Sequence, residues 1–522
     1  MVRMARQFGI VTLVAAASFC ALAQPPDWSR KMAAAEKAYS EHRYSVAEGL
    51  FNSSLKDAEA FGSADPRLAA NLTQLAQTYQ REGKYANAEP LYKRAQAMLE
   101  QQRGADDPDL ALVVTGLGDL YRATGKYAQA EPLYARAAAS LEKAGPEHRQ
   151  ALAAVTGSLA TLYRIEGRYA EAQKLFERAL QIIEGLPTVT SAAFTNAAAN
   201  LAELYRLQSR YADAEALYQR AIKVQEKFLG PDDPDLAISL NDLAELYRNT
   251  GRLNEAEPLY QRSLEIRRKA YPANDPRISF ALNNLGLLYT AQGRYRDAEA
   301  MLKETLTIRE SAEGFDHPDV AIPLGNLALL MENERKYGEA EALYQRALKV
   351  RESALGPNHP DVAITLVDLA DLYVRQAKWG KAMDLLKRAL AIRQTAFGPE
   401  HPQIAGTLNT IGQVEFATGH LAEAEQDFVH ALAIREKTLG SEHRAVAFSL
   451  SDLAKLYYAE KKYSQSEALY RRALAIREKV LGPRHPEVAA SLETLAMVLN
   501  ADGQEVEAAK LRARAEEIRS KK

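Results

Sequence analysis

Five histidines stand out first, because they recur along the chain at a constant 42-residue step. They are His317, His359, His401, His443 and His485. Imidazole is a good zinc ligand, but a metal site needs its ligands to converge within a few ångströms. Equivalent positions in successive units of a repeating array are instead separated by a whole unit. The spacing therefore predicts loop and helix-start residues, and no metal site.

Tyrosines and carboxylates are the other side chains that could do chemistry. Tyr79, Tyr85, Tyr92 and their equivalents could form a stacking platform for bases or sugars, but their helical spacing favours aromatic residues of a core. The chain contains 68 Asp and Glu residues, so pairs of carboxylates carry little information. It has no phosphate-binding loop, nucleophile elbow or zinc-protease helix motif. We expect no enzymatic activity and no cofactor.

The histidines belong to a helix-turn-helix unit, which residues 235–261 show most clearly. The unit recurs with the same 42-residue period, and Gly251 marks the turn between its two helices. Equivalent turn positions fall at residues 83, 125, 167, 209, 251, 293, 335, 377, 419, 461 and 503. Copies in such strict register indicate a helical repeat array. Because each unit buries its apolar face only against its neighbours, we expect one continuous structure held by nearest-neighbour contacts.

Apolar and small residues define the two helices of each unit. In the first helix, Leu240, Leu243 and Tyr247 follow the i, i+3, i+7 spacing of one apolar face. In the second helix, Ala256 and its equivalents are small, which lets two helix axes approach closely. Asp-Pro or His-Pro precedes most first helices, as expected for a capping side chain followed by proline. Leu-Gly-Pro or a related sequence ends most second helices.

These motifs resemble the tetratricopeptide repeats (TPR), in the 42-residue form found in kinesin light chains and many bacterial proteins. The likeness rests on the Leu-Ala/Gly-x-x-Tyr run, on turns such as Gly83-Lys84-Tyr85, and on the Ala-Glu-x-Leu-Tyr and Arg-Ala-Leu runs of the second helix. It covers about residues 28–522. HEAT and armadillo repeats have a similar period, but they do not explain the register of the small residues.

The repeats and the resemblance together predict an all-α fold, an α-α superhelix (TPR solenoid) of about twelve helix-turn-helix repeats. Residues 24–61 form an N-terminal capping repeat, and residues 62–504 form the tandem array. Residues 505–522 form a C-terminal capping helix, which is strongly charged outside its few apolar positions.

Residues 1–23 have the layout of a cleavable secretory signal. Arg3 and Arg6 precede an apolar run that is too short to span a bilayer, and Ala21-Leu22-Ala23 provides the small residues of a cleavage site. An uncleaved anchor and a lipoprotein signal that uses Cys20 are the alternatives. We expect an exported protein, periplasmic or secreted, without a membrane span after signal removal.

The charge balance bears on the choice of partner. Lys and Arg number 66 and Asp and Glu number 68, which gives a net charge of −2. A broadly basic surface for nucleic acid is therefore excluded, although a local basic patch remains possible. The sequence does not predict an oligomeric state.

A polar arc of the first helix lies opposite its apolar face. In tetratricopeptide arrays the first helix lines the concave surface, so the resemblance implies that this arc is a groove wall. The candidate peptide-binding residues are Asn200, Asp242, Asn283, Asn284, Asn326, Asp368, Arg122, Arg164, Arg206 and Arg248. Side-chain amides can both donate to and accept from an extended backbone. The resemblance to kinesin light chains also implies this role for pairs such as Asn283-Asn284.

The arginines allow two interpretations. Along the groove they would favour an acidic segment by charge pairing. Alternatively they form a solvated face held by i, i+3 pairs, such as Asp119 with Arg122 and Glu203 with Arg206. The amides could likewise be plain solvated polar residues.

Three functions remain open from the sequence. The first is a non-enzymatic scaffold that binds an extended peptide or partner segment in the concave groove. The second is a structural or assembly element of an envelope complex that acts through its convex face or its ends. The third is an accessory domain for a catalytic partner on another chain.

Overall fold

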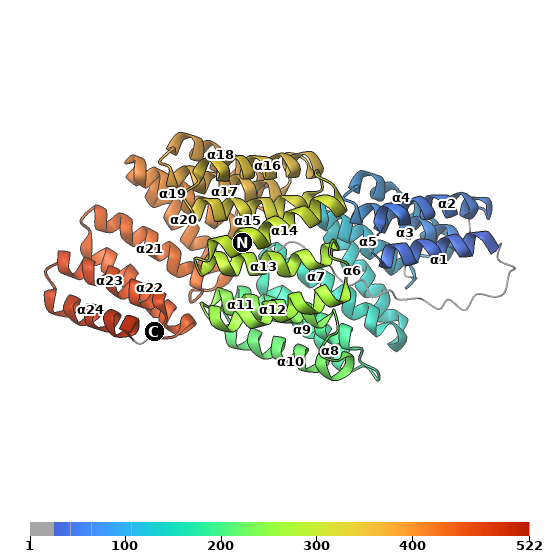
Figure 1. Ribbon diagram of the computed structural model, residues 1–522, viewed down its shortest axis with the longest axis horizontal. Helices are drawn as coiled ribbons and strands as arrows, with labels where there is room; N and C mark the ends of the chain where they lie inside the picture. Colours follow the sequence, from blue (N-terminus) through green and yellow to red (C-terminus); the bar gives the residue numbers. More distant parts are fainter. Residues whose placement is uncertain (1–25, 42, 64, 106, 521–522) are drawn as a thin grey trace.

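The computed structural model describes residues 26–520 except residues 42, 64 and 106, so the predicted signal lies outside the described residues. The described part is all-helical, and its helices alternate as first and second members of helix-turn-helix pairs (Figure 1). The first members are α1 Pro26–Ser40, α3 Pro66–Arg81, α5 Leu110–Ala123, α7 Arg149–Ile165, α9 Ser191–Leu207, α11 Leu236–Asn249, α13 Pro276–Ala291, α15 Ala321–Asn333, α17 Pro360–Arg375, α19 Pro402–Thr418, α21 Arg444–Ala459 and α23 Pro486–Ala501.

The second members are α2 Tyr44–Ala60, α4 Tyr85–Arg103, α6 Tyr127–Ala144, α8 Tyr169–Glu184, α10 Tyr211–Leu229, α12 Leu253–Ala270, α14 Tyr295–Glu313, α16 Tyr337–Leu355, α18 Trp379–Phe397, α20 Leu421–Leu439, α22 Tyr463–Leu481 and α24 Glu505–Ser520. Two short 3-10 helices, η1 Pro146–His148 and η2 Pro318–Val320, precede α7 and α15. The predicted all-α repeat architecture is confirmed. Within the described residues, no helix is long and apolar enough to cross a bilayer.

The residues at the starts of the odd-numbered helices act as the sequence predicts. Asp65 and Asp275 accept a hydrogen bond from the backbone N–H two residues later, and proline follows each of them. His359 and His401 make the same bond through Nδ1. These side chains satisfy backbone donors that the first helical turn leaves without an intrahelical partner.

The turn between the two helices of a pair has one backbone conformation throughout the array. All eleven predicted turn positions have positive φ. Seven of them are glycine, and the other four are Ser209, Arg335, Ala377 and Lys461, with φ between 55° and 61°. A positive φ is unfavourable for residues with a Cβ atom. The repeat geometry therefore imposes this turn conformation even where the turn residue has a Cβ atom.

Packing within and between pairs follows the small-residue register. Ala256 and Tyr260 of α12 are fully buried, and Ala244 of α11 is fully buried as well. The same pattern continues through neighbouring pairs in one large apolar cluster that extends from α9 to α19. At the C-terminal end, α24 buries Ala508 and Ala515 and leaves its other face to solvent.

The odd-numbered helices lie on the inner side of the curved array. Each of α5, α7, α9, α11, α13, α15, α17 and α19 packs against the odd-numbered helices of both adjacent pairs, whereas adjacent even-numbered helices lie further apart. A stack of helix pairs curves toward the side on which its helices are closer. The array therefore winds with odd-numbered helices inside and even-numbered helices outside, from blue α1 to red α24 along the long axis (Figure 1).

Successive turns of this superhelix touch each other. The Nε2 atoms of His359, His401 and His443 lie 3.0, 2.5 and 2.5 Å from the backbone oxygens of Ala123, Ile165 and Leu207, in each case 236 residues earlier. Nε2 of His485 lies 3.3 Å from the oxygen of Thr250. We call this row of contacts the seam. The expectation of nearest-neighbour contacts alone was wrong, because one superhelical turn takes slightly less than six repeats and brings distant repeats together.

Candidate binding surface on the inner face

The odd-numbered helices expose one stripe toward the inside of the superhelix. The offsets −13, −6 and −2 from each turn position share a side of the helix, because the intervals between them are close to whole numbers of helical turns. Large apolar side chains occupy many of the −13 positions and some of the −6 positions. We call these side chains the inner lane. The inner lane comprises Leu112, Ile238, Phe280, Leu287, Ile322, Leu329, Ile364, Phe448 and Met497.

Part of the inner lane is open to solvent. Leu112, Ile238, Leu329, Phe448 and Met497 are 37–46 % exposed. Phe280, Ile322 and Ile364 continue the stripe in half-buried positions. Exposed apolar side chains that recur on the inner face serve no purpose in the core, so they are candidates for contact with a ligand.

The predicted amides lie on the flank of this stripe, where adjacent odd-numbered helices meet. Nδ2 of Asn326 on α15 donates to Oδ1 of Asn283 on α13 at 2.7 Å, and Asn326 is only 5 % exposed. Asn409 and Asp452 repeat this contact between α19 and α21 at 2.5 Å. Asn283 and Asn326 therefore join neighbouring repeats, while the adjacent Asn284 is half-buried and makes no side-chain bond of this kind to another described residue.

The remaining polar candidate residues are buried in the inner wall to different degrees. Asn200 is half-buried, Asp242 is buried, and both interact with neighbouring groups. Burial raises the pKa of Asp368 above the ordinary value for a carboxyl group. Burial, together with the nearby Asp368 and Glu332, also raises the pKa of Asp371 to about 7. The raised pKa values favour neutral carboxyl groups, and a nearby cation would favour their charged forms.

The predicted arginines are largely paired within the wall. Arg122 contacts Asp119 at 3.1 Å and the hydroxyl of Tyr134 at 3.2 Å. Arg206 contacts Glu203 at 2.7 Å. Arg164 is half-buried and engaged with neighbours, and Arg248 is half-buried with Nε lacking a hydrogen-bond partner in the described structure. The i, i+3 pairs of the alternative interpretation are thus present for Arg122 and Arg206.

A second series of arginines was missed from the sequence. It lies at offset +16 from the turn positions, on the even-numbered helices, and comprises Arg267, Arg309, Arg351, Arg393, Arg435 and Arg477. Arg393 shows its role: its Nη1 donates to the backbone oxygen of Gln403 at 3.1 Å and to the hydroxyl of Thr407 at 2.6 Å. Each bond ties the end of one repeat to the start of the next. The 42-residue recurrence of Arg was the signal that could have revealed this series.

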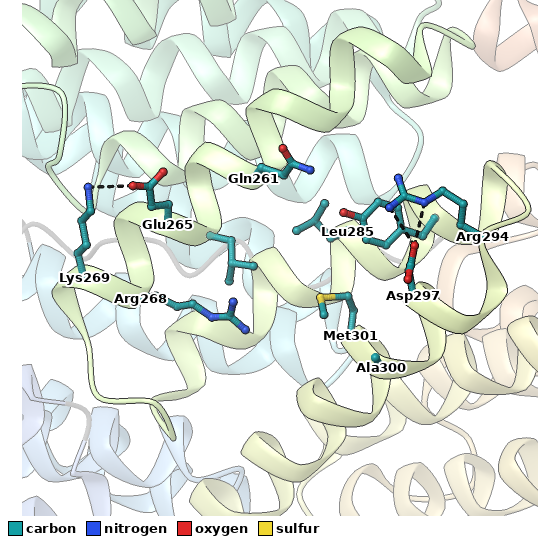
Figure 2. A pocket seen from close by; sticks show the side chains of 11 residues that line it. Gln261, Glu265, Arg268, Lys269, Leu285, Arg294, Asp297, Ala300 and Met301 are labelled. Atoms are coloured by element: carbon teal, nitrogen blue, oxygen red, sulfur yellow. Dashed lines mark hydrogen bonds and ion pairs between the residues drawn. The ribbon is translucent and has the colours of Figure 1, made fainter.

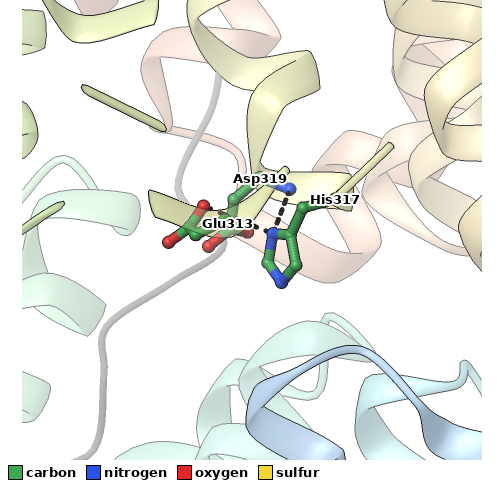
Figure 3. A group of neighbouring side chains, drawn as sticks. All are labelled: Glu313, His317 and Asp319. Carbon is green, nitrogen blue, oxygen red and sulfur yellow. Dashed lines mark hydrogen bonds and ion pairs between the residues drawn. The ribbon is translucent and has the colours of Figure 1, made fainter. Parts of the chain in front are cut away.

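Glu313, His317 and Asp319 form the one cluster among the described residues with the spacing of metal ligands (Figure 3). Arg309 lies between the two carboxylates, 2.6 Å from Glu313 and 3.2 Å from Asp319. His317 Nδ1 already accepts the backbone N–H of Asp319 at 3.2 Å. A cation would have to displace a guanidinium and a helix cap, so the donor set suits an internal ion-pair network better than a metal.

A shallow pocket of about 580 Å³ lies on the outer side, between α12, α13 and α14 (Figure 2). Leu264, Leu285 and Met301 form its apolar floor. The charges on its rim are paired: Lys269 with Glu265 at 3.0 Å and Arg294 with Asp297 at 2.9 Å. With these charges neutralised by one another, the pocket has little with which to orient a polar ligand.

Comparisons with known proteins agree with this architecture. The chain matches the family described as Tetratricopeptide repeat in nine overlapping segments that together span residues 67–185 and 193–521. No curated protein sequence matches the chain significantly.

Solved structures of similar proteins include a putative kinesin light chain with nearly identical TPR-like repeats from Podosopora anserina, at 28% identity and a TM-score of 0.35, with 39% of this chain and 97% of the other covered. BtubC (BKLC) from P. vanneervenii is 24% identical, with a TM-score of 0.37 and coverage of 45% and 92%. A Rap protein complexed with competence and sporulation factor is 15% identical, with a TM-score of 0.48 and coverage of 79% and 98%.

Proposed function

Because this chain belongs to the tetratricopeptide repeat family, we propose that it is a non-enzymatic scaffold that binds an extended segment of a protein partner along its inner lane. The observation that carries the proposal is the recurrence of exposed apolar side chains on the inner face, from Leu112 on α5 to Met497 on α23. Side chains at this spacing can receive apolar residues of an extended segment, while burial of these groups supplies the free energy of binding.

Polar groups beside the lane provide the second component of recognition. An extended segment carries a free backbone donor and acceptor at each residue, which an amide such as Asn284 can satisfy. The carboxyl groups of α15 and α17 favour a basic residue of the ligand near Asp371. Arg122 and Arg206 are available to an acidic residue only at the cost of their existing pairs.

Substitutions on the inner lane test this function. A partner is first captured from the source cell with the full protein and identified, and its affinity is then measured by titration. Replacing Leu329 and Phe448 together with Asp places charges on two exposed apolar sites, so we expect binding to weaken at least roughly tenfold. Helicity should be unchanged, because both side chains are exposed.

The matched control is Val429→Asp. Val429 lies on the outer helix α20 and is 46 % exposed, as much as the lane residues. We expect it to bind the partner with wild-type affinity. If Val429→Asp weakens binding and the double lane variant does not, the convex-face assembly function replaces the one proposed here.

A further inference from the structure

The seam histidines make two different hydrogen bonds at once. Nδ1 of His401 accepts the backbone N–H of Gln403 at 3.1 Å, which caps α19. Nε2 faces the backbone oxygen of Ile165 at the end of α7, one superhelical turn earlier. His359 and His443 repeat both contacts. A carbonyl oxygen can only accept, so Nε2 carries the proton, and Nδ1 accepts through its lone pair, so the ring is neutral. A second proton would go on Nδ1, where it would meet the backbone N–H that the ring now accepts, so a charged ring cannot keep both contacts in this position.

The choice of capping residue follows the seam. Helix starts before residue 236 have no earlier turn of the superhelix to face, and there the caps are residues such as Asp65, Asp107 and Asp233. From residue 317 onward, histidine stands at this position before every first helix of a pair. Aspartate caps a helix equally well, but it has no N–H to offer the oxygen of the facing turn. Asp275, opposite the N-terminal repeat, directs its carboxylate to Arg277 instead.

Ring stacking and close contacts accompany the hydrogen bonds of the seam. His401 stacks on Phe397 at 4.2 Å between ring centroids, and Phe397 stacks on Tyr127 of the earlier turn at 5.4 Å. A Cβ atom on Gly167 would lie 2.6 Å from Cδ of Pro402. The ring of His401 is therefore enclosed by residues from two turns of the superhelix.

Charged groups around the seam oppose a second proton on these rings. Arg393 faces His401 from α18, and Arg435 and Arg444 face His443. Glu166, at the end of α7, is bound to Arg168 at 3.1 Å. Burial is the largest influence; it outweighs the hydrogen bonds to the backbone oxygens of Ile165 and Leu207, which by themselves raise the pKa, and the pKa of His401 falls to about 4 and that of His443 below its ordinary value.

His317, one repeat before the seam, differs from the seam histidines. It lies against Gly83 of the earlier turn. Burial alone would lower its pKa, but the side chains of Glu313 and Asp319 outweigh burial and raise it. A proton on Nδ1 would be received by Oε2 of Glu313, 3.3 Å away (Figure 3). The surroundings of His317 are thus compatible with a charged imidazole, whereas those of His401 and His443 are not.

We propose that the seam is an acid-sensitive latch: neutral His401 and His443 hold successive turns together, and their protonation releases the turns and opens the superhelix sideways. In the open state these rings regain an ordinary pKa near 6.5, so they take up protons before the closed state does. The closed state is fully favoured above about pH 6.5 and is lost as the pH falls toward 4. The latch does not depend on what the inner lane binds, but its opening would expose that lane along its length.

Spin-label distances across the seam test this proposal in the full chain. Labels are attached to cysteines at Ala212→Cys and Ser441→Cys, two exposed positions near the contact of Leu207 with His443, in a Cys20→Ser background. At pH 7.5 we expect a single short distance between the two spin labels. At pH 5.5 a longer population should appear, with the ratio of open to closed molecules raised roughly tenfold for His401 alone and more with His443. Far-UV circular dichroism should not change.

Two variants separate the latch from other titrating groups. The pair His401→Asn and His443→Asn keeps a capping acceptor and an N–H donor but cannot titrate, so its distance should not respond to pH. It retains Asp371 and Glu415, whose pKa values of about 7 and about 6 also fall in this range. The pair His401→Asp and His443→Asp should be open at pH 7.5. An unchanged wild-type distance, an equal response in the Asn variant, or a parallel loss of helicity would each overturn the proposal.

Discussion

Histidine and aspartate are equivalent helix caps in a single repeat, and only the superhelix distinguishes them. Both accept the first backbone N–H, but His359 also donates to the backbone oxygen of Ala123 on another turn. The sequence correctly predicts that the five histidines are helix-start residues. It does not reveal the second bond, because the number of repeats per turn depends on the sum of small packing angles that no single repeat encodes.

The amides on the inner face also have unequal roles, which a pair of substitutions can separate. Asn326→Ala should lower the free energy of unfolding by about 1–3 kcal/mol, because it removes a hydrogen bond made by a buried side chain and leaves Oδ1 of the half-buried Asn283 without its donor. Asn284→Ala should change it by less than about 0.5 kcal/mol, because Asn284 makes no such bond between repeats. Chemical denaturation of the two variants measures the difference. Equal effects would mean that the bond between Asn283 and Asn326 does not hold the repeats together.

At the scale of elements, most of the structure could be predicted from the sequence. The turn register and the small-residue contacts recur eleven times, and helix caps recur in most repeats, so local signals that would be weak alone reinforce one another. The inner face was predicted less well. The polar arc was expected to be open, but the close approach of odd-numbered helices buries Asn326 and Asp242 and leaves the apolar lane exposed instead. Helical periodicity identifies a face, whereas its burial depends on the curvature of the array.

Turn residues should show how strictly the array imposes its geometry. Lys461 has φ 61°, so Lys461→Gly should relieve backbone strain and stabilise the protein by about 0.5–1 kcal/mol. Gly167→Ala should destabilise it by about 2 kcal/mol or more, because it adds both strain at φ 75° and a clash with Pro402. Thermal unfolding midpoints of the two variants should move in opposite directions. A shift in the same direction would contradict the assigned turn conformation.

At the scale of the molecule, the array combines local packing with contacts between turns. Removal of residues 378–419 takes out one 42-residue unit and keeps the remaining units in register. Ala123 then still faces His359, whereas Ile165 and Leu207 face His443 and His485, so the seam loses one contact but stays aligned. We expect a folded, shorter superhelix with unchanged helicity per residue, as judged by circular dichroism.

The matching control for this deletion removes α18 alone. Loss of Trp379–Phe397 uncovers the apolar faces of α17 and α19, so the protein should lose helicity and cooperativity. If both deletions had the same effect, the 42-residue unit would not be the unit of stability.

The central claim is that the inner lane is the recognition surface, and position-specific crosslinking tests it most directly. A photoreactive amino acid is placed in the full protein at position 329, 448 or 429, one at a time, and each protein is irradiated in extract of the source cell. We predict that Leu329 and Phe448 on the inner lane give the same crosslinked partner and that the equally exposed Val429 on the outer face does not. Crosslinking from position 429 alone would contradict the account.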